Sequence, residues 1–201
     1  MHAWAFFCAI PAALALVLHA DGAAATVGAA VYSLTLLGLF GTSAAYHRLA
    51  QSMRARQVMQ RLDHAMIYLL IAGTYVPLCL VALPRAWGIP LLATVGGLAV
   101  LGVVLKVVAF ESAPCKVVSY SLYLVMGWAA IIAAPVLVDH LTAGQLALIV
   151  AGGIAYTIGF PVLFTRRPNP WPTTFGYHEI WHTLVVVAAG LHFAAVANVT
   201  S

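Results

Sequence analysis

The amino-acid sequence predicts an all-α polytopic membrane protein with seven transmembrane helices, N-terminus cytoplasmic and C-terminus outside, as a single domain over residues 1–201. Hydrophobic residues make up 64% of the chain, charged residues 7%, and mean hydropathy is +1.01. A soluble domain carries roughly a quarter charged residues, so lipid must cover most of this surface. The apolar runs are continuous and about 20 residues long, whereas a barrel would need alternating strands of about ten residues. Helices satisfy their own backbone hydrogen bonds in lipid and are therefore preferred.

The seven predicted spans follow one another along the chain. Pro77, Pro135 and Pro161 lie inside three of them, where local kinks are expected. The connection over 47–61 is polar, and the one over 166–172 contains proline and asparagine. Cys8, Cys79 and Cys115 are widely separated and odd in number, which argues against a disulfide framework and against a cysteine zinc site. The predicted spans cover about 4–20, 24–46, 64–83, 87–109, 117–138, 141–164 and 173–196.

The positive charges predict the orientation. The chain has nine Lys and Arg residues, and only Arg85 falls in a connection on the side opposite to the others. The positive-inside rule therefore places the N-terminus in the cytoplasm and the C-terminus outside. The net charge of +4 reports this topology and does not indicate a nucleic-acid partner. We expect a multi-pass protein of the cell (plasma or inner) membrane. The remaining basic residues are Arg48, Arg54, Arg56, Arg61, Lys106, Lys116, Arg166 and Arg167.

Five polar residues converge on the cytoplasmic leaflet in this topology: Ser43, His47, Asp63, His178 and His182. The i, i+4 spacing of the last two histidines puts both imidazoles on one helix face, a spacing that zinc accepts. A third histidine from another helix would complete a three-histidine site with an open fourth position, which is the catalytic arrangement. Asp63 would then hold or deprotonate the water on the metal, and Ser43 would add a hydrogen bond.

Each of these residues also has an interpretation without chemistry. His178 and His182 can be a packed or interfacial pair, and His47 can be an interfacial histidine beside Arg48. Asp63 can cap the third helix, and Ser43 can pack or bond its own backbone.

The other candidates are predicted to have ordinary roles. Glu179 completes an HExxH string, which supplies a general base in zinc proteases, but pairing with a loop arginine or a neighbouring helix is preferred here. His64 is expected at the interface and His192 in packing. Solvation is expected for the three histidines at segment ends, His2, His19 and His140.

Four sequence strings resemble one known family. They are SAAYHR at 43–48, RLDH at 61–64, IAGTYVP at 71–77 and HEIWH at 178–182, followed by HF at 192–193. Their combination and order resemble the bacterial hemolysin III branch of the progestin and adipoQ receptor family, which includes the adiponectin receptors. The resemblance implies a seven-helix fold and a zinc ion held by His47, His178 and His182. It also implies that Asp63 bonds the water on the metal with Ser43 nearby, as in ceramidase-like hydrolases of lipid amides.

Four functions are compatible with these observations. The first is a zinc-dependent hydrolase of a lipid amide or ester, with membrane lipids as partners and a lipid substrate or ligand within the helix bundle. The second is a non-enzymatic sensor or regulator of the membrane with structural zinc. An intramembrane metalloprotease would use Glu179 as its base. A cytolysin is the fourth, although the sequence lacks an amphipathic pore-forming segment.

Overall fold

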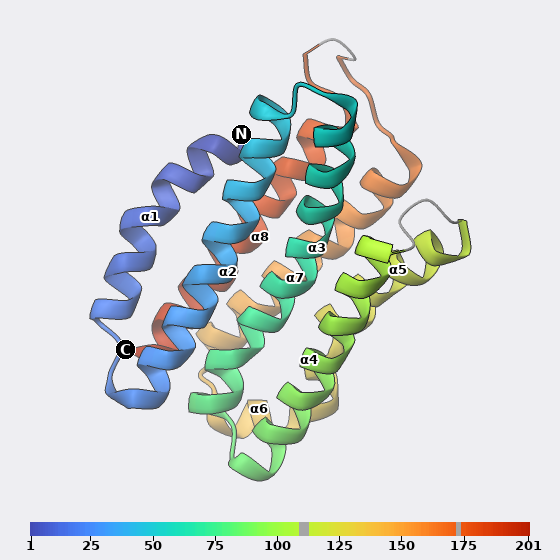
Figure 1. Ribbon diagram of the computed structural model, residues 1–201. Helices are drawn as coiled ribbons and strands as arrows, with labels where there is room; N and C mark the ends of the chain where they lie inside the picture. Colours follow the sequence, from blue (N-terminus) through green and yellow to red (C-terminus); the bar gives the residue numbers. More distant parts are fainter. Residues whose placement is uncertain (109–112, 172–173) are drawn as a thin grey trace.

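The computed structural model describes residues 1–108, 113–171 and 174–201, and it is a bundle of long helices running up and down (Figure 1). The described residues contain no β-strand and only one isolated bridge, between Trp171 and Phe175. The elements in chain order are α1 (His2–Leu18), α2 (Gly22–Leu49), α3 (Met53–Pro77), the π-helical η1 (Leu78–Ala82), α4 (Arg85–Val108), α5 (Ala113–Gly127), the 3₁₀-helical η2 (Ala129–Ala133), α6 (Ala134–His140), α7 (Ala143–Thr165) and α8 (Tyr177–Thr200).

The predicted all-α polytopic membrane fold is confirmed. Six helical segments are long and apolar enough to cross a membrane, and α1 is a shorter apolar helix beside them. Two of the six are composite, because α3 continues into η1 and α5 continues through η2 into α6. The predicted ends at Ala109 and Thr173 lie outside the described residues.

The third helix starts much earlier than its apolar run. It begins at Met53 rather than near residue 64, so most of the polar stretch 47–61 is helical rather than a connection. The Ser52 side chain caps this start by accepting a hydrogen bond from the backbone N–H of Ala55. A run of apolar residues marks only the part of a helix that faces lipid. The prediction therefore does not include the polar first turns of α3.

Two of the three prolines that were expected to kink a span, Pro77 and Pro135, stand where the type of helix changes. Pro77 is the last residue of α3, and the chain continues as π-helix. Pro135 stands at the start of α6, directly after a 3₁₀ turn. Proline lacks an N–H and clashes with the preceding turn, so a change of hydrogen-bond pattern is its expected effect. The α-helix α7 runs through Pro161.

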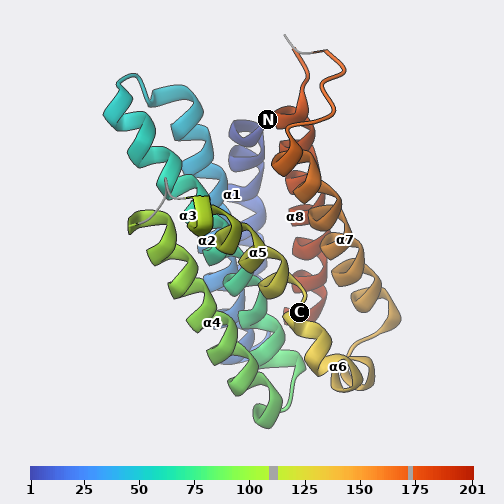
Figure 2. The same cartoon turned by 90° about the vertical axis from the view of Figure 1, so that its right-hand side faces the viewer.

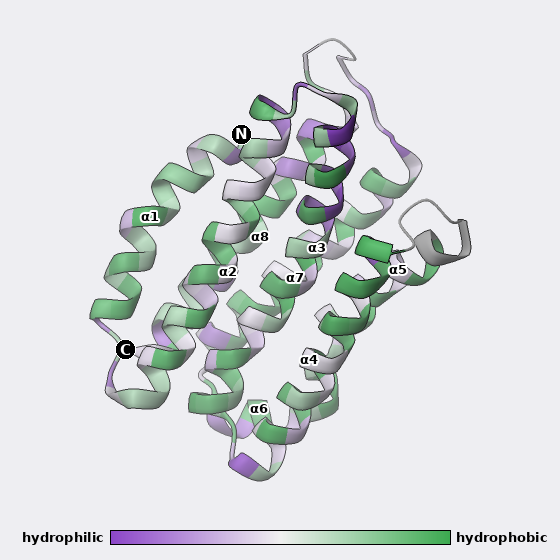
Figure 3. Ribbon diagram, in the orientation of Figure 1, coloured by the Kyte–Doolittle hydropathy of each residue, from purple (hydrophilic) through white to green (hydrophobic). Residues whose placement is uncertain are grey.

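The two ends of the bundle differ in polarity. The N-terminus and the α2–α3 and α7–α8 connections lie at one end (Figure 2). Hydrophilic residues gather there on the end of α2 and the first turns of α3 (Figure 3). At the opposite end the backbone N–H of Asp21, between α1 and α2, donates to the carbonyl of Thr200 near the C-terminus. The chain alternates between the ends as the sequence predicted.

Two apolar clusters hold the helices together. One, around Tyr32, Phe40 and Val185, joins α1, α2 and α8. The other, around Tyr68 and Met126, joins α3, α4 and α5. Of the cysteines, Cys8 and Cys79 are free thiols, as expected, and the Cys115 side chain lies outside the described part.

Candidate metal centre

Two side chains close in sequence accept hydrogen bonds from the backbone at the start of α8. Glu179 accepts a hydrogen bond from the backbone N–H of Gly176 at 2.8 Å, and the Asn169 side chain accepts one from the N–H of Tyr177 at 3.0 Å. Glu179 therefore caps its own helix from the third helical position, through its bond to the backbone N–H of the N-cap residue Gly176. The hydrogen-bond partner that the described residues give Glu179 is the backbone of Gly176, and the predicted pairing with a loop arginine or a neighbouring helix stays a prediction. Because the helix begins directly after this cap, His178 and His182 lie on its first two turns.

Three histidines from two helices meet at this end of the bundle. His47 lies in the last turn of α2 and faces the pair on α8. The Nε2 atoms of His47 and His178 are 3.3 Å apart, and one ring nitrogen from each of the three histidines lies within 4.8 Å of the others. The convergence predicted for His47, His178 and His182 is thus present in the fold.

The three nitrogens lie close enough together to serve as ligands of one metal ion. Zinc–nitrogen bonds of about 2.0–2.1 Å in a tetrahedral site place neighbouring nitrogens roughly 3.3–3.4 Å apart. The separation of 3.3 Å between His47 and His178 agrees with that spacing. His182 is buried, His178 is half-buried and His47 is exposed, so an ion can enter from the polar end. Imidazole ligands suit zinc, copper, iron and nickel alike, so the donors define a metal site without identifying its ion.

Asp63 lies well inside α3, where it cannot cap the helix. Ser52 is the cap, which makes the capping interpretation of Asp63 wrong. The side chains of Asp63, Ser43 and His182 line one cavity. The structure therefore brings the two predicted polar residues beside the innermost histidine of the cluster.

His2 is a member of this group that sequence reasoning missed. Its side chain is only 6% exposed, although solvation was expected at the end of the first span. Its Nδ1 atom is 2.8 Å from Oγ of Ser43, and its ring stacks on that of His182 with centroids 3.8 Å apart. No spacing in the sequence links His2 to these residues, because only the docking of α1 against α2 and α8 brings them together.

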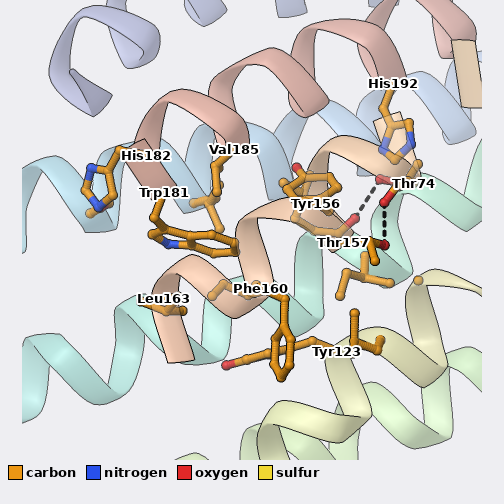
Figure 4. Close-up of a pocket in the computed structure, with 18 of the residues that line it drawn as sticks. Thr74, Tyr123, Tyr156, Thr157, Phe160, Leu163, Trp181, His182, Val185 and His192 are labelled. Carbon is orange, nitrogen blue, oxygen red and sulfur yellow. Dashed lines mark hydrogen bonds between the residues drawn. The ribbon is translucent and has the colours of Figure 1, made fainter. Parts of the chain in front are cut away.

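The cavity extends from this polar group into the bundle. Its lining is mostly apolar. His182 and Trp181 lie near one end, Phe160 and Val185 along the length, and His192 near the other end (Figure 4). A cavity of this shape and polarity suits a molecule with a long apolar chain and a polar head.

The other histidines bond within the fold. His19, His64 and His140 each have Nδ1 at 2.8 Å from the carbonyl oxygen four residues earlier in their own helices. His19 and His140 are exposed as expected. His192 packs between α7 and α8, with Nε2 3.2 Å from the Ile149 carbonyl oxygen, in agreement with its predicted packing role.

Known proteins are similar to this sequence over most of its length. The model of the family described as "Haemolysin-III related" matches residues 1–193. The chain is 34% identical over 190 residues to Hemolysin-3 of Bacillus cereus, covering 93% of this chain and 83% of that protein. It is 31% identical over 190 residues to the Hemolysin-3 homolog of Bacillus subtilis (strain 168), covering 93% and 85%.

Proposed function

Because the chain belongs to the haemolysin III family, we propose that it is a multi-pass protein of the cell membrane that hydrolyses a lipid amide at a zinc ion. His47, His178 and His182 would hold the ion. The observation that carries the proposal is the position of these three histidines beside an apolar cavity whose polar end also holds Asp63 and Ser43. In the predicted orientation this polar end lies in the cytoplasmic leaflet, at the depth of lipid headgroups.

The chain's own residues would divide the work as follows. A zinc ion in such a site supplies a Lewis acid that activates water and polarises a carbonyl. The Asp63 carboxylate takes the proton from the attacking water as the oxygen–carbon bond forms. It returns that proton to the amine nitrogen as the carbon–nitrogen bond breaks. Ser43, which lines the cavity together with Asp63, would help to position that carboxyl, and the apolar lining would orient the acyl chain.

A second candidate function rests on the way the histidines join two helices. His47 belongs to α2 and the pair belongs to α8, so a bound ion would clasp these helices. A regulator that senses the membrane state through such a clasp would need the ligands but not Asp63. The protease interpretation is weaker because Glu179 is engaged with the Gly176 N–H at the start of its helix.

Asp63→Asn separates the two candidates. We expect this variant to keep its metal content, since Asp63 is outside the histidine group, and to lose about 10²- to 10⁴-fold in hydrolysis of N-acyl lipids. The measurement is fatty-acid release from a panel including ceramides, by zinc-loaded protein in nanodiscs. Asp139→Asn, an exposed carboxylate at the end of α6, is the matched control and should retain full activity. Absence of hydrolysis by zinc-loaded wild type across the panel, or full activity in Asp63→Asn, would overturn the hydrolase proposal.

A further inference from the structure

We propose that Trp128 forms the floor of the cavity and limits the acyl chain of its ligand to about 12–14 carbons, the length of lauric and myristic acid. The inference rests on the proposed function in that an acyl lipid occupies the cavity with its polar head at the histidine cluster. It adds the chain length of that lipid and the residue that determines it.

The cavity ends at one level of the bundle, before the helices around it do. Its lining on α7 begins at Gly153 and its lining on α8 ends at His192, although both helices continue beyond these positions. On α3 the last lining residue is Tyr75, and no described residue past this level lines the cavity. Figure 4 shows Thr157 and His192 at this end, away from His182. A chain that enters from the histidine cluster therefore meets a wall at this level.

Trp128 joins two walls of the cavity at this level. It directly follows α5, and its indole N–H donates a hydrogen bond to the Thr157 hydroxyl on α7 at 2.9 Å. Its ring also faces Gly153 on α7, where an added Cβ would lie 3.6 Å from the ring. All three residues line the cavity. The largest of the side chains thus bridges α5 and α7 where the cavity ends, and a glycine opposite leaves room for it.

Tyr75 fixes the backbone that carries this tryptophan. Its hydroxyl, on α3, donates a hydrogen bond to the Met126 carbonyl at 2.8 Å and accepts one from the backbone N–H of Ala130 at 2.9 Å. These two backbone groups stand on either side of Trp128, where α5 ends and the 3₁₀ turn η2 begins. Backbone groups at a break in a helix need partners from elsewhere, and one hydroxyl supplies both here. The floor is therefore attached to α3 as well as to α7.

The distance from the histidine cluster to this floor sets the chain length. His182 and His192 mark the two ends of the lining on α8, and their separation in sequence corresponds to about 15 Å along the helix. An extended hydrocarbon chain with bonds of about 1.5 Å advances roughly 1.3 Å per carbon, so about 12 carbons reach the floor. A slightly longer chain fits with a bend. A much longer one must fold back or withdraw its polar head from the cluster, and either change weakens binding.

Binding of saturated fatty acids, from decanoic to arachidic acid, tests the proposal without requiring turnover. These acids are the expected products of amide hydrolysis and cannot be cleaved further. The zinc-loaded full chain in nanodiscs is offered an equimolar mixture, and the retained acids are quantified by mass spectrometry. We expect the wild type to retain lauric and myristic acid most and stearic acid about tenfold less. Dividing a variant's profile by that of the wild type removes partitioning into the bilayer, which is the same for both.

Two substitutions at the floor should move this profile in opposite directions. Trp128→Ala adds the space of the indole ring to the cavity, so the maximum should move to acids longer by about two to four carbons. Gly153→Leu adds a side chain from the opposite wall and should move the maximum to shorter acids. Trp87→Ala is the matched control, because it removes the same type of side chain from an exposed position on α4 outside the cavity. Its profile should equal that of the wild type.

The outcomes separate the role of Trp128 from folding and from the hydrolase proposal. If Trp128→Ala lacks a cooperative melting transition, Trp128→Phe replaces it and should give a smaller shift in the same direction. A wild-type profile without a drop up to arachidic acid, or an unchanged profile in a folded Trp128 variant, would overturn the floor and leave the hydrolase proposal intact. The expected shift in a protein that hydrolyses no lipid amide would support the floor and overturn the hydrolase proposal alone. No retention of any acid by the wild type would overturn both.

Discussion

Two histidines of α8 line the same cavity at opposite ends and have different surroundings. His182 stands among three other imidazoles, those of His2, His47 and His178. His192 has a backbone carbonyl, that of Ile149, within hydrogen-bond distance and packs closely against Gly152. His182 is surrounded by other imidazole rings, whereas His192 has a hydrogen-bond partner in the protein backbone.

The comparison teaches that a histidine within a membrane span indicates a site only when its nitrogens have no backbone partner. Both side chains are costly to bury in lipid, and each must be compensated. A carbonyl oxygen compensates His192 locally. The neighbours of His182 are other imidazoles, and one metal ion bound by His47, His178 and His182 would compensate these three rings together.

The largest expected difference between the two ends concerns metal content. His182→Ala removes one of three nitrogen ligands, so we expect zinc to fall from roughly one ion per chain to near zero. His192→Ala should leave it at roughly one, because this side chain is outside the cluster. Elemental analysis of both purified variants, each with a melting curve to verify folding, provides the measurement. Loss of zinc in a folded His192→Ala protein would contradict the comparison.

A smaller effect is expected from crowding the His192 end. A methyl group at Gly152 would overlap the His192 ring, so Gly152→Ala should destabilise the fold by about 1–3 kcal/mol without changing metal content. At Gly153 the added carbon would lie 3.6 Å from the Trp128 ring, which is ordinary contact, so Gly153→Ala is the matched control. Thermal unfolding in detergent is the readout. Restoration of stability in Gly152→Ala combined with His192→Ala would attribute the loss to this pair.

The smallest change in stability and activity is expected at Glu179, which follows His178 on α8. Glutamine can accept the same hydrogen bond from Gly176, so Glu179→Gln should leave metal content and the rate of hydrolysis unchanged. Its free energy of unfolding should stay within about 0.5 kcal/mol of the wild type. Glu179→Ala loses the cap and should cost about 0.5–2 kcal/mol. The melting temperatures of the two variants, measured together with lipid hydrolysis, test this. A large loss of hydrolysis in a stable Glu179→Gln protein would restore the general-base interpretation.

The prediction from sequence succeeded where one physical rule acts along a single helix. Apolar run length located the spans, and the i, i+4 rule placed His178 and His182 on one face. It failed at the polar turns of α3, because helix propensity and the Ser52 cap continue the helix beyond its apolar part. It also did not anticipate that Glu179 caps its own helix, because the expected partner was a loop arginine or a neighbouring helix and the partner in the structure is the backbone of Gly176, three residues earlier.

The sequence by itself determined the helical membrane fold, the alternation of its ends and the family, because lipid imposes strict requirements on length, charge and backbone hydrogen bonding. It also supplied the three histidines, whose convergence follows from that alternation. Only the tertiary structure decided which atoms lie inside. The packing of α1 buries His2 against His182 and Ser43, and the packing of helices from both halves of the chain forms the cavity. Those contacts join residues that are far apart along the chain, and no periodicity within one helix encodes them.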